Sequence, residues 1–218
     1  MTEPNDAIEW VYEAMFHPRE PISAAWLAKR HLADAVRLLI ERMATTEATP
    51  EAMDAATEDV IALSAKLGLH PALRPAKESR EAEDLHGYIR RFHEVNPFAG
   101  TSNPLAPPVR MWREEGRCVG EVTFGWAYEG PMGCVHGGHV AGVFDQFLGY
   151  VQTTTNEAGF TASLEVDYLR LTPLHVPLRL EGRVTGKDDR KIFAEGSLFA
   201  GERETARSRA IFVRSGVR

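Results

Sequence analysis

The sequence has 218 residues, of which 44% are hydrophobic and 26% are charged, and its formal net charge is −6. This length and composition are typical of a globular protein with one substantial core plus an extension, and no apolar run reaches the roughly 18 residues of a membrane-spanning helix. The negative charge argues against a nucleic-acid-binding protein that neutralises the phosphate backbone, because such a protein carries a basic face.

The first residues and the cysteines predict the compartment. The N-terminus reads MTEPNDAIEW, which is acidic where a secretory signal is basic and then apolar. The two cysteines, Cys118 and Cys134, are too few for a disulfide scaffold and are typical of reduced thiols. We therefore expect a cytoplasmic protein with no membrane partner.

Residues 22–69 predict two helices. Ser23 can cap the first helix, Thr49 followed by Pro50 can start the second, and Gly68 can end it. Neither helix carries a group of residues typical of a catalytic site. We expect a helical hairpin packed on the main domain, with a lid over a substrate tunnel or an additional oligomer contact as alternatives.

A charged segment, residues 78–92, favours a third helix, and four prolines between residues 96 and 109 then exclude regular structure. The sequence accordingly predicts an N-terminal helical extension, residues 1–92, and a main domain, residues 93–218. Within that domain Val122, Phe124, Trp126 and Tyr128 alternate with small or polar residues, which is typical of a strand with one buried face.

The segment 131–150, PMGCVHGGHVAGVFDQFLGY, predicts the central helix. Asp145 lies on that helix between two residues with almost no side chain, Ala141 and Gly149, each four positions away. We therefore expect an acid that a ligand can approach closely rather than an ordinary surface charge. The buried stripe is formed by apolar residues at three-and-four spacing, Val140, Val143, Phe144, Phe147, Leu148 and Val151.

Four further strands are predicted after the helix, at 160–171, 178–186, 191–200 and 204–213, with a turn at 186–189. One long helix between an early strand region and a run of later strands indicates an α+β fold. In this fold a strongly curved antiparallel sheet wraps around the helix.

The start of the central helix offers hydrogen-bond donors. Gly137 and Gly138 leave their N–H groups unobstructed, and the first turn of a helix has donors without intrahelical partners at the positive end of its dipole. Such donors polarise a carbonyl or hold an oxyanion. Together with Asp145 as a base or nucleophile, they indicate acyl-transfer chemistry.

The spacing of these groups predicts a dimer. Gly137 and Asp145 are eight residues apart, which is about 12 Å along a helix axis. One carbonyl cannot contact both, because each contact must be roughly 3 Å. The two groups therefore serve one substrate only if they come from two copies of the helix related by a two-fold axis.

The succession of His136-Gly137-Gly138, Asp145 and then Thr161 in FTASLEVDYLR resembles the hotdog-fold acyl-CoA thioesterases of the PaaI-like branch, over roughly residues 96–213. The resemblance implies that Asp145 is the base or nucleophile. It also implies that the Gly137 amide of the partner subunit holds the thioester oxygen, and that Thr161 assists near the attacking water. A polar residue ahead of the sheet, Asn103 or Asn96, is a candidate substrate contact.

The function predicted on this basis is hydrolysis of an acyl-CoA to the free acid and coenzyme A by a homodimer or homotetramer. His136 would orient the thioester, and Gly138 would assist Gly137. Coenzyme A is expected as part of the substrate, with no separate cofactor and no metal. Basic residues that are candidates for its phosphates are Arg170, Lys187, Arg190 and Lys191.

Other interpretations remain open at this stage. His136 can simply cap the helix, and Thr161 can be an ordinary strand hydroxyl. Cys134 can be a thiol nucleophile activated by His136. A metal site is a further alternative, with Cys134, His136, His139 and Asp145 as its ligands, although their spacing matches no compact zinc pattern. A hotdog hydratase or dehydratase and a non-catalytic acyl-CoA-binding protein are the competing functions.

Overall fold

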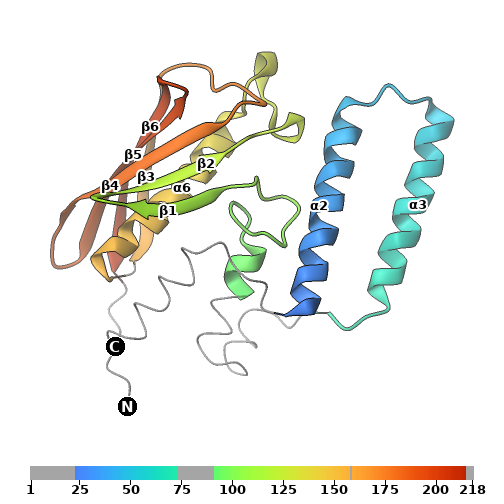
Figure 1. Cartoon of the computed structure of the whole chain (residues 1–218), viewed down its shortest axis with the longest axis horizontal. Coiled ribbons are helices and arrows are strands. Elements are labelled where there is room, and N and C mark those ends of the chain that lie inside the picture. Colours follow the sequence, from blue (N-terminus) through green and yellow to red (C-terminus); the bar gives the residue numbers. More distant parts are fainter. Residues whose placement is uncertain (1–22, 73–90, 158, 215–218) are drawn as a thin grey trace.

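The computed structural model describes residues 23–72, 91–157 and 159–214. A curved six-stranded sheet wraps around one central helix, α6, and two further helices, α2 and α3, stand beside this domain (Figure 1). The α+β layout predicted from the sequence, a curved antiparallel sheet around one long helix with helices before it, is confirmed.

All strand pairs of the sheet are antiparallel, in the order β1-β2-β4-β5-β6-β3. Within the described residues β3 pairs only with β6, so β3 forms one edge of the sheet. The predicted turn at 186–189 joins β4 to β5 and is closed by a hydrogen bond from the N–H of Asp188 to the carbonyl of Lys191. The strands are β1 (Arg110–Glu114), β2 (Arg117–Val122), β3 (Gly159–Tyr168), β4 (Leu178–Lys187), β5 (Lys191–Ala200) and β6 (Arg203–Arg214).

Helix α6, Gly137–Gln152, packs its predicted apolar stripe into the concave face of the sheet. Phe144, Phe147 and Leu148 are fully buried there. Gly182 on β4 permits this close contact, because a Cβ at that position would lie 2.7 Å from the Phe147 ring. The position of α6, and of every residue on its other face, is therefore fixed by the core.

The prediction of a strand through Tyr128 was wrong beyond Val122. Residues Trp126–Tyr128 form a short 3-10 helix, η1, and two similar turns, η2 (Pro131–Gly133) and η3 (Thr153–Thr155), flank α6. The cause is a tertiary contact, since the Glu41 carboxylate of α2 accepts hydrogen bonds from the N–H groups of Trp126 and Ala127. These donors therefore cannot serve a sheet ladder.

Helices α2, Ala24–Thr45, and α3, Pro50–Gly68, form as predicted, with Ser23 and Thr49 as their N-caps. Helix α2 packs against the main domain. Helix α3 does not, because none of its residues is buried within the described part of the chain. The predicted packing of the hairpin on the domain is thus true of one helix only. Of the predicted third helix, residues 78–90 lie outside the described residues.

Residues 94–106 form a strap between α2 and the sheet domain, and two arginines of α2 hold it. Arg37 donates to the backbone carbonyls of Gly100, Thr101, Asn103 and Ala106. Arg30 forms an ion pair with Glu94, whose side chain is 2% exposed. The strap is therefore fixed to α2 by charge-assisted hydrogen bonds.

The pKa of Glu94 reflects these contacts. Burial by itself raises the pKa of this carboxyl group, but hydrogen bonds from Arg30, Ser102 and Thr101, with the charge of Arg30, outweigh burial and leave the pKa below its ordinary value. Ionised Glu94 therefore stabilises the fold above the pKa of 4.5 that the group has when unfolded. This stabilisation is lost as the pH falls through the lower pKa of the folded state.

Replacing Glu94 with Gln should lower the free energy of unfolding by about 2 kcal/mol at pH 7, because hydrogen bonds to a charged group contribute roughly that much. The variant should also lose part of the acid dependence of stability below pH 4.5, because the pKa of this carboxyl group is lowered from 4.5 in the folded state. Urea unfolding followed by circular dichroism at several pH values measures both effects. Glu115→Gln, in the exposed turn between β1 and β2, is the control. Equal stability of Glu94→Gln and the wild type would contradict this account.

Candidate active site

The start of α6 is held from both sides by backbone hydrogen bonds. The N–H of His136 donates to the carbonyl of Tyr128, and the N–H of Val135 donates to the carbonyl of Thr172. The hydroxyl of Tyr168, at the end of β3, donates to the carbonyl of Gly137 at 2.8 Å. The first turn of the helix is therefore fixed relative to η1 and to β3.

The donors of this first turn are not equivalent. The N–H of Gly138 donates to Nδ1 of its neighbour His136 at 3.0 Å, and the N–H of His139 donates to the carbonyl of His136. Among the described residues, the N–H of Gly137 has no hydrogen-bond partner. His136 is thus the N-cap of α6, and Gly137 carries the donor that remains for a ligand.

The structure brings Asp145 and Thr161 into contact. The hydroxyl of Thr161 on β3 donates to Oδ1 of Asp145 at 2.9 Å. Asp145 is half-buried, and a Cβ on Gly149, one turn further along α6, would meet no atom within 4 Å. The carboxylate therefore has a fixed orientation and an open space beside it.

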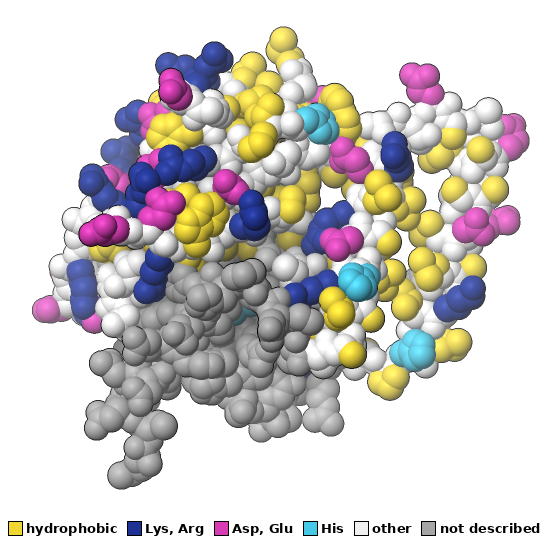
Figure 2. All heavy atoms as spheres, viewed as in Figure 1, with side chains coloured by type: hydrophobic (Ala, Val, Ile, Leu, Met, Phe, Trp, Pro, Cys, Tyr) yellow, Lys and Arg dark blue, Asp and Glu magenta, His cyan; other side chains and the backbone are white. Residues whose placement is uncertain are grey.

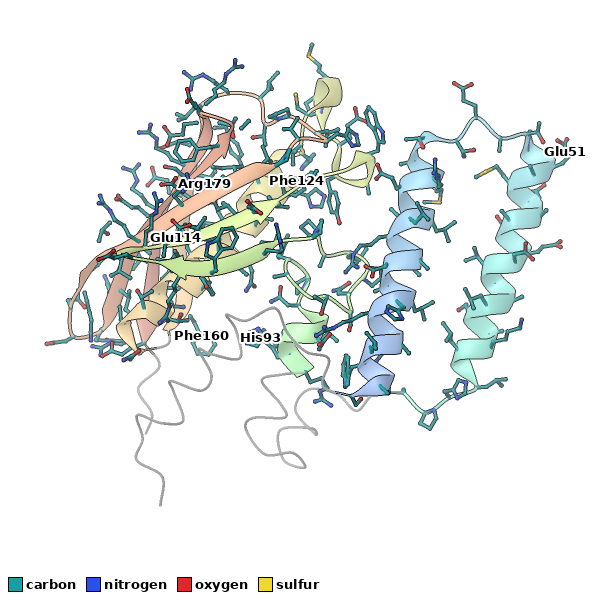
Figure 3. The ribbon with its side chains drawn as sticks, viewed as in Figure 1. Glu51, His93, Glu114, Phe124, Phe160 and Arg179 are labelled. Carbon is teal, nitrogen blue, oxygen red and sulfur yellow. The ribbon has the colours of Figure 1, made fainter. Side chains whose placement is uncertain are left out.

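The two parts of the site lie at opposite ends of β3 within one chain. Gly137 contacts Tyr168 at the end of the strand, whereas Asp145 contacts Thr161 near its start. Figure 3 labels Phe160 at the start of β3 and Phe124 toward the other end of the sheet. The eight residues between Gly137 and Asp145 correspond to about 12 Å of helix, so one chain does not present both groups to a single carbonyl.

The strap contacts α6 beside Asp145, which the sequence did not predict. The side chain of Asn96 is buried and donates through Nδ2 to Oε1 of Gln146 at 2.8 Å. The ring of Phe98 covers Gly142, where a Cβ would lie 2.1 Å from the ring. A glycine at this position of the helix was the only sequence signal for this contact. The strap thus borders the open face of α6 next to the acid.

The polar candidates ahead of the sheet stabilise the strap itself. The Asn96 side-chain oxygen accepts from the N–H groups of Phe98 and Ala99. Asn103 donates to the carbonyl of Val95 and accepts from the N–H of Leu105. The side chain of Asn103 is therefore engaged within its own loop.

The basic candidates do not form one cluster within the chain. Lys187, Arg190 and Lys191 lie at the β4–β5 hairpin, and Lys187 pairs with Glu157. Arg170 lies beyond the other end of β3 and donates to the carbonyl of Glu204. Since Lys191 is in register with Val213 and Phe160, the two positions are roughly 30 Å apart along β3.

The cysteines and histidines were the candidates for other chemistry. The thiol of Cys134, the candidate nucleophile, donates to the carbonyl of Met132 at 3.6 Å. Burial raises the pKa of the Cys118 thiol to about 11, so this thiol stays protonated near neutral pH. Burial and the nearby His136 lower the pKa of His139. No group of three or more His, Cys, Asp or Glu residues suited to a metal ion occurs among the described residues. In the same part of the chain, no helix is sufficiently long and apolar to cross a membrane.

Comparison with known proteins places this geometry in context. No protein-family model matches the chain, and no curated protein matches it. A solved structure described as a thioesterase superfamily protein is similar, with a TM-score of 0.74 and 29% sequence identity over 91% of this chain and 94% of that chain. The chain has the fold of the hotdog thioesterases. Because the match covers more than the hotdog domain, it also includes part of the N-terminal helical extension.

Other hotdog structures match half of the chain. The Escherichia coli PaaI protein from the phenylacetic acid degradation operon has a TM-score of 0.45 and 17% identity over 50% of this chain and 80% of that chain. A hypothetical thioesterase from Streptococcus pneumoniae, solved with coenzyme A, has a TM-score of 0.46 and 18% identity over 50% of this chain and 89% of that chain. The fold that the predicted resemblance implies, that of a hotdog thioesterase, is confirmed by the first of these matches, which has the TM-score of 0.74.

Proposed function

We propose that this protein is an acyl-CoA thioesterase in which Asp145 activates water or attacks the thioester carbon. The observation that carries the proposal is the hydrogen bond of 2.9 Å from Thr161 to Asp145 on the open face of α6. The hydroxyl orients one carboxylate oxygen, and the other remains available to a water molecule or a carbonyl carbon. The similarity to a thioesterase superfamily protein over 91% of the chain supports the same chemistry.

The Gly137 N–H is the proposed oxyanion donor. It lies at the positive end of the α6 dipole and has no hydrogen-bond partner among the described residues. Gly138 contributes indirectly, because its N–H holds the His136 ring as the helix cap. His136 in turn positions the first turn of α6 beside the thioester.

We propose that the complete site forms in a homodimer through the free edge of β3. This strand exposes most of its residues, including Phe160 at 74% and Tyr168 at 54%. Two β3 strands paired antiparallel about a two-fold axis near Leu164 would place Thr161 of one copy near Tyr168 of the other. Asp145 would then face the partner subunit's Gly137, and two equal sites would result.

The same pairing accounts for the separated basic residues. Pairing of the two β3 strands would join the two sheets into one. Arg170 of one copy would then lie at the same end of this joined sheet as the β4–β5 hairpin of the other copy. The hairpin residues Lys187, Arg190 and Lys191 and the Arg170 of the other chain would then be able to contact the phosphates of one coenzyme A. We therefore propose that coenzyme A esters, rather than small oxygen esters, are the substrates.

Release of free thiol from a panel of aryl, short-chain and long-chain CoA esters tests this function. We expect saturable hydrolysis of at least one class. Hydration of an enoyl-CoA without thiol release would instead identify a hydratase. Saturable calorimetric binding of acyl-CoA with no thiol released over hours would identify a binding protein.

Replacing Thr161 with Val should lower kcat roughly 10-fold with little change in KM, because the carboxylate loses one hydrogen bond of the charged type. Val keeps the shape of Thr and suits a strand. Thr161→Ser, which keeps the hydroxyl, should retain most of the activity. If Thr161→Val and Thr161→Ser have the same kcat, the hydroxyl does not orient Asp145. Steady-state thiol release measures both variants.

A further inference from the structure

Helix α3 has an apolar surface that is exposed in the described part of the chain. Large apolar side chains on α2 and α3 are exposed, and they gather along both helices in the space-filling view (Figure 2). The two helices stand apart and are joined by residues 46–49 (Figure 1). These exposed side chains are Leu27, Leu38, Leu39, Met43, Met53, Val60, Ile61, Leu63, Leu67 and Leu69.

The exposed apolar surface of the two helices is large. Ten large side chains at roughly 50 Å² each give on the order of 500 Å² per chain, which is in the range of the largest apolar patch on a typical monomer, and such patches are often functional. With the polar flanks of the same helices, an association through this surface approaches the roughly 800 Å² per partner of a standard interface. A stable complex can therefore form through α2 and α3.

The spacing of residues on α3 favours a second copy as the partner. Met53, Ala56, Val60, Leu63 and Leu67 recur at alternating intervals of three and four, the pattern of a helix that packs along its length on another helix. This row is nearly symmetric about Val60. Two antiparallel copies crossing there place Val60 against Val60 and Met53 against Leu67 of the other copy.

The charges of α3 agree with the antiparallel arrangement. The helix carries four acids, Glu51, Asp54, Glu58 and Asp59, and one base, Lys66, a net charge of −3. Antiparallel crossing at Val60 places Lys66 beside Asp54 of the other copy and separates the acidic halves, whereas parallel crossing would align them. On helix α2, Arg30 and Arg37 are engaged with Glu94 and the strap, so Lys29 and Arg42 are the bases that suit the acidic α3 of another copy.

We infer that the α2–α3 hairpins of two copies associate, with α3 of each copy packed in the space between α2 and α3 of the other. Helix α2 is fixed to the hotdog domain by Arg30, Arg37 and Glu41, so it serves as a rigid support. Helix α3 gains burial that the described part of its own chain does not provide. This interface is separate from the β3 edge and does not depend on the proposed enzymatic activity.

Disulfide trapping in the full-length chain tests this interface. In a Cys118→Ser, Cys134→Ser background, Val60→Cys should give a disulfide-linked dimer under mild oxidation at low protein concentration. The control is Glu58→Cys, two residues away on the opposite side of the same helix. We expect at least ~10-fold more linked dimer for Val60→Cys, because residues held together in a complex react at a high effective concentration.

The amounts of disulfide-linked dimer decide whether α3 packs against α3 of a second copy. Equal linkage of the two variants, or none, would overturn the inference, since it would show that α3 meets its equivalent only by random collision or not at all. A hairpin that closes on itself, or that binds a different protein, gives the same negative result in the purified chain.

A charge substitution supplies a second measurement. Val60→Asp should weaken hairpin association by at least ~10-fold, as expected for a residue at the centre of an interface, while Glu58→Asp should not. Sedimentation velocity over a concentration series measures the change, and circular dichroism checks that α3 remains helical. Unchanged association of a folded Val60→Asp protein would also overturn the inference.

Discussion

Acyl-CoA hydrolysis should fall by at least ~100-fold when Asp145 is replaced with Asn, the scale expected for the loss of a general base or nucleophile. The amide has nearly the same shape as the carboxylate and its oxygen can still accept the Thr161 hydroxyl, which lies 2.9 Å away in the wild type. Asn cannot take a proton from water or form an acyl intermediate. The loss should therefore appear in kcat rather than in KM.

The measurement is thiol release with the best substrate of the panel, together with sedimentation velocity to confirm the oligomeric state. Glu115→Gln, which alters an exposed acid in the turn between β1 and β2, is the matched control and should keep full activity. Unchanged turnover in Asp145→Asn would remove the catalytic assignment. A loss of association along with activity would instead indicate a structural role.

Removing the N–H group of Gly137, the proposed oxyanion donor, should lower acyl-CoA hydrolysis about as much as Asp145→Asn does. Gly137→Pro removes the N–H of the first helical residue, a position where proline is favoured. The backbone of the preceding residue, His136, has φ −61° and ψ 132°, the region that a residue before proline adopts. We expect kcat to fall about 10²- to 10³-fold, as when one donor of an oxyanion hole is lost.

Gly137→Ala is the control for this substitution. It keeps the N–H group, and its Cβ meets the Tyr168 ring at 3.3 Å, so it reproduces the steric contact that proline also makes. Equal activity of the proline and alanine variants would mean that the N–H is not an oxyanion donor. Thermal unfolding of both variants checks that α6 still forms.

Mixing the two inactive variants tests whether the site is shared. In a dimer of one Asp145→Asn chain and one Gly137→Pro chain, one site has both substitutions and the other has none. Random pairing would therefore restore about a quarter of the wild-type activity. A site formed within one chain would recover nothing, which would exclude the β3-edge arrangement while leaving the hydrolase proposal open.

The parts of the fold that follow local patterns could be predicted from the sequence. Three-and-four apolar spacing predicted α6, Ser23 and Thr49 predicted the helix starts, and alternation predicted the later strands, because these signals depend on residues close in the chain. The choice of Thr161 as a site residue came only through the resemblance to a family, and its hydrogen bond to Asp145 became known from the structure.

The failures of sequence-based prediction have a common physical cause. Residues 126–128 alternate like a strand, but Glu41, 85 residues from Trp126, takes their backbone donors. Nothing near Asn96 or Phe98 in the sequence points to Gln146 and Gly142 on α6. Contacts of this kind depend on which elements meet in space, and local preference does not encode them.

The sequence by itself determined a helix with an acid between small residues and a free donor region two turns earlier, since helical spacing alone separates these groups by about 12 Å. The structure selected one of the two roles that the sequence allowed for His136, that of a helix cap, which occupies the N–H of Gly138 and leaves Gly137 as the available donor. The structure also decided that, among the residues it describes, β3 is an edge of the sheet and no residue of α3 is buried. Hydrogen-bond partners and burial are properties of the packed chain, so they become known only when all the elements are in place.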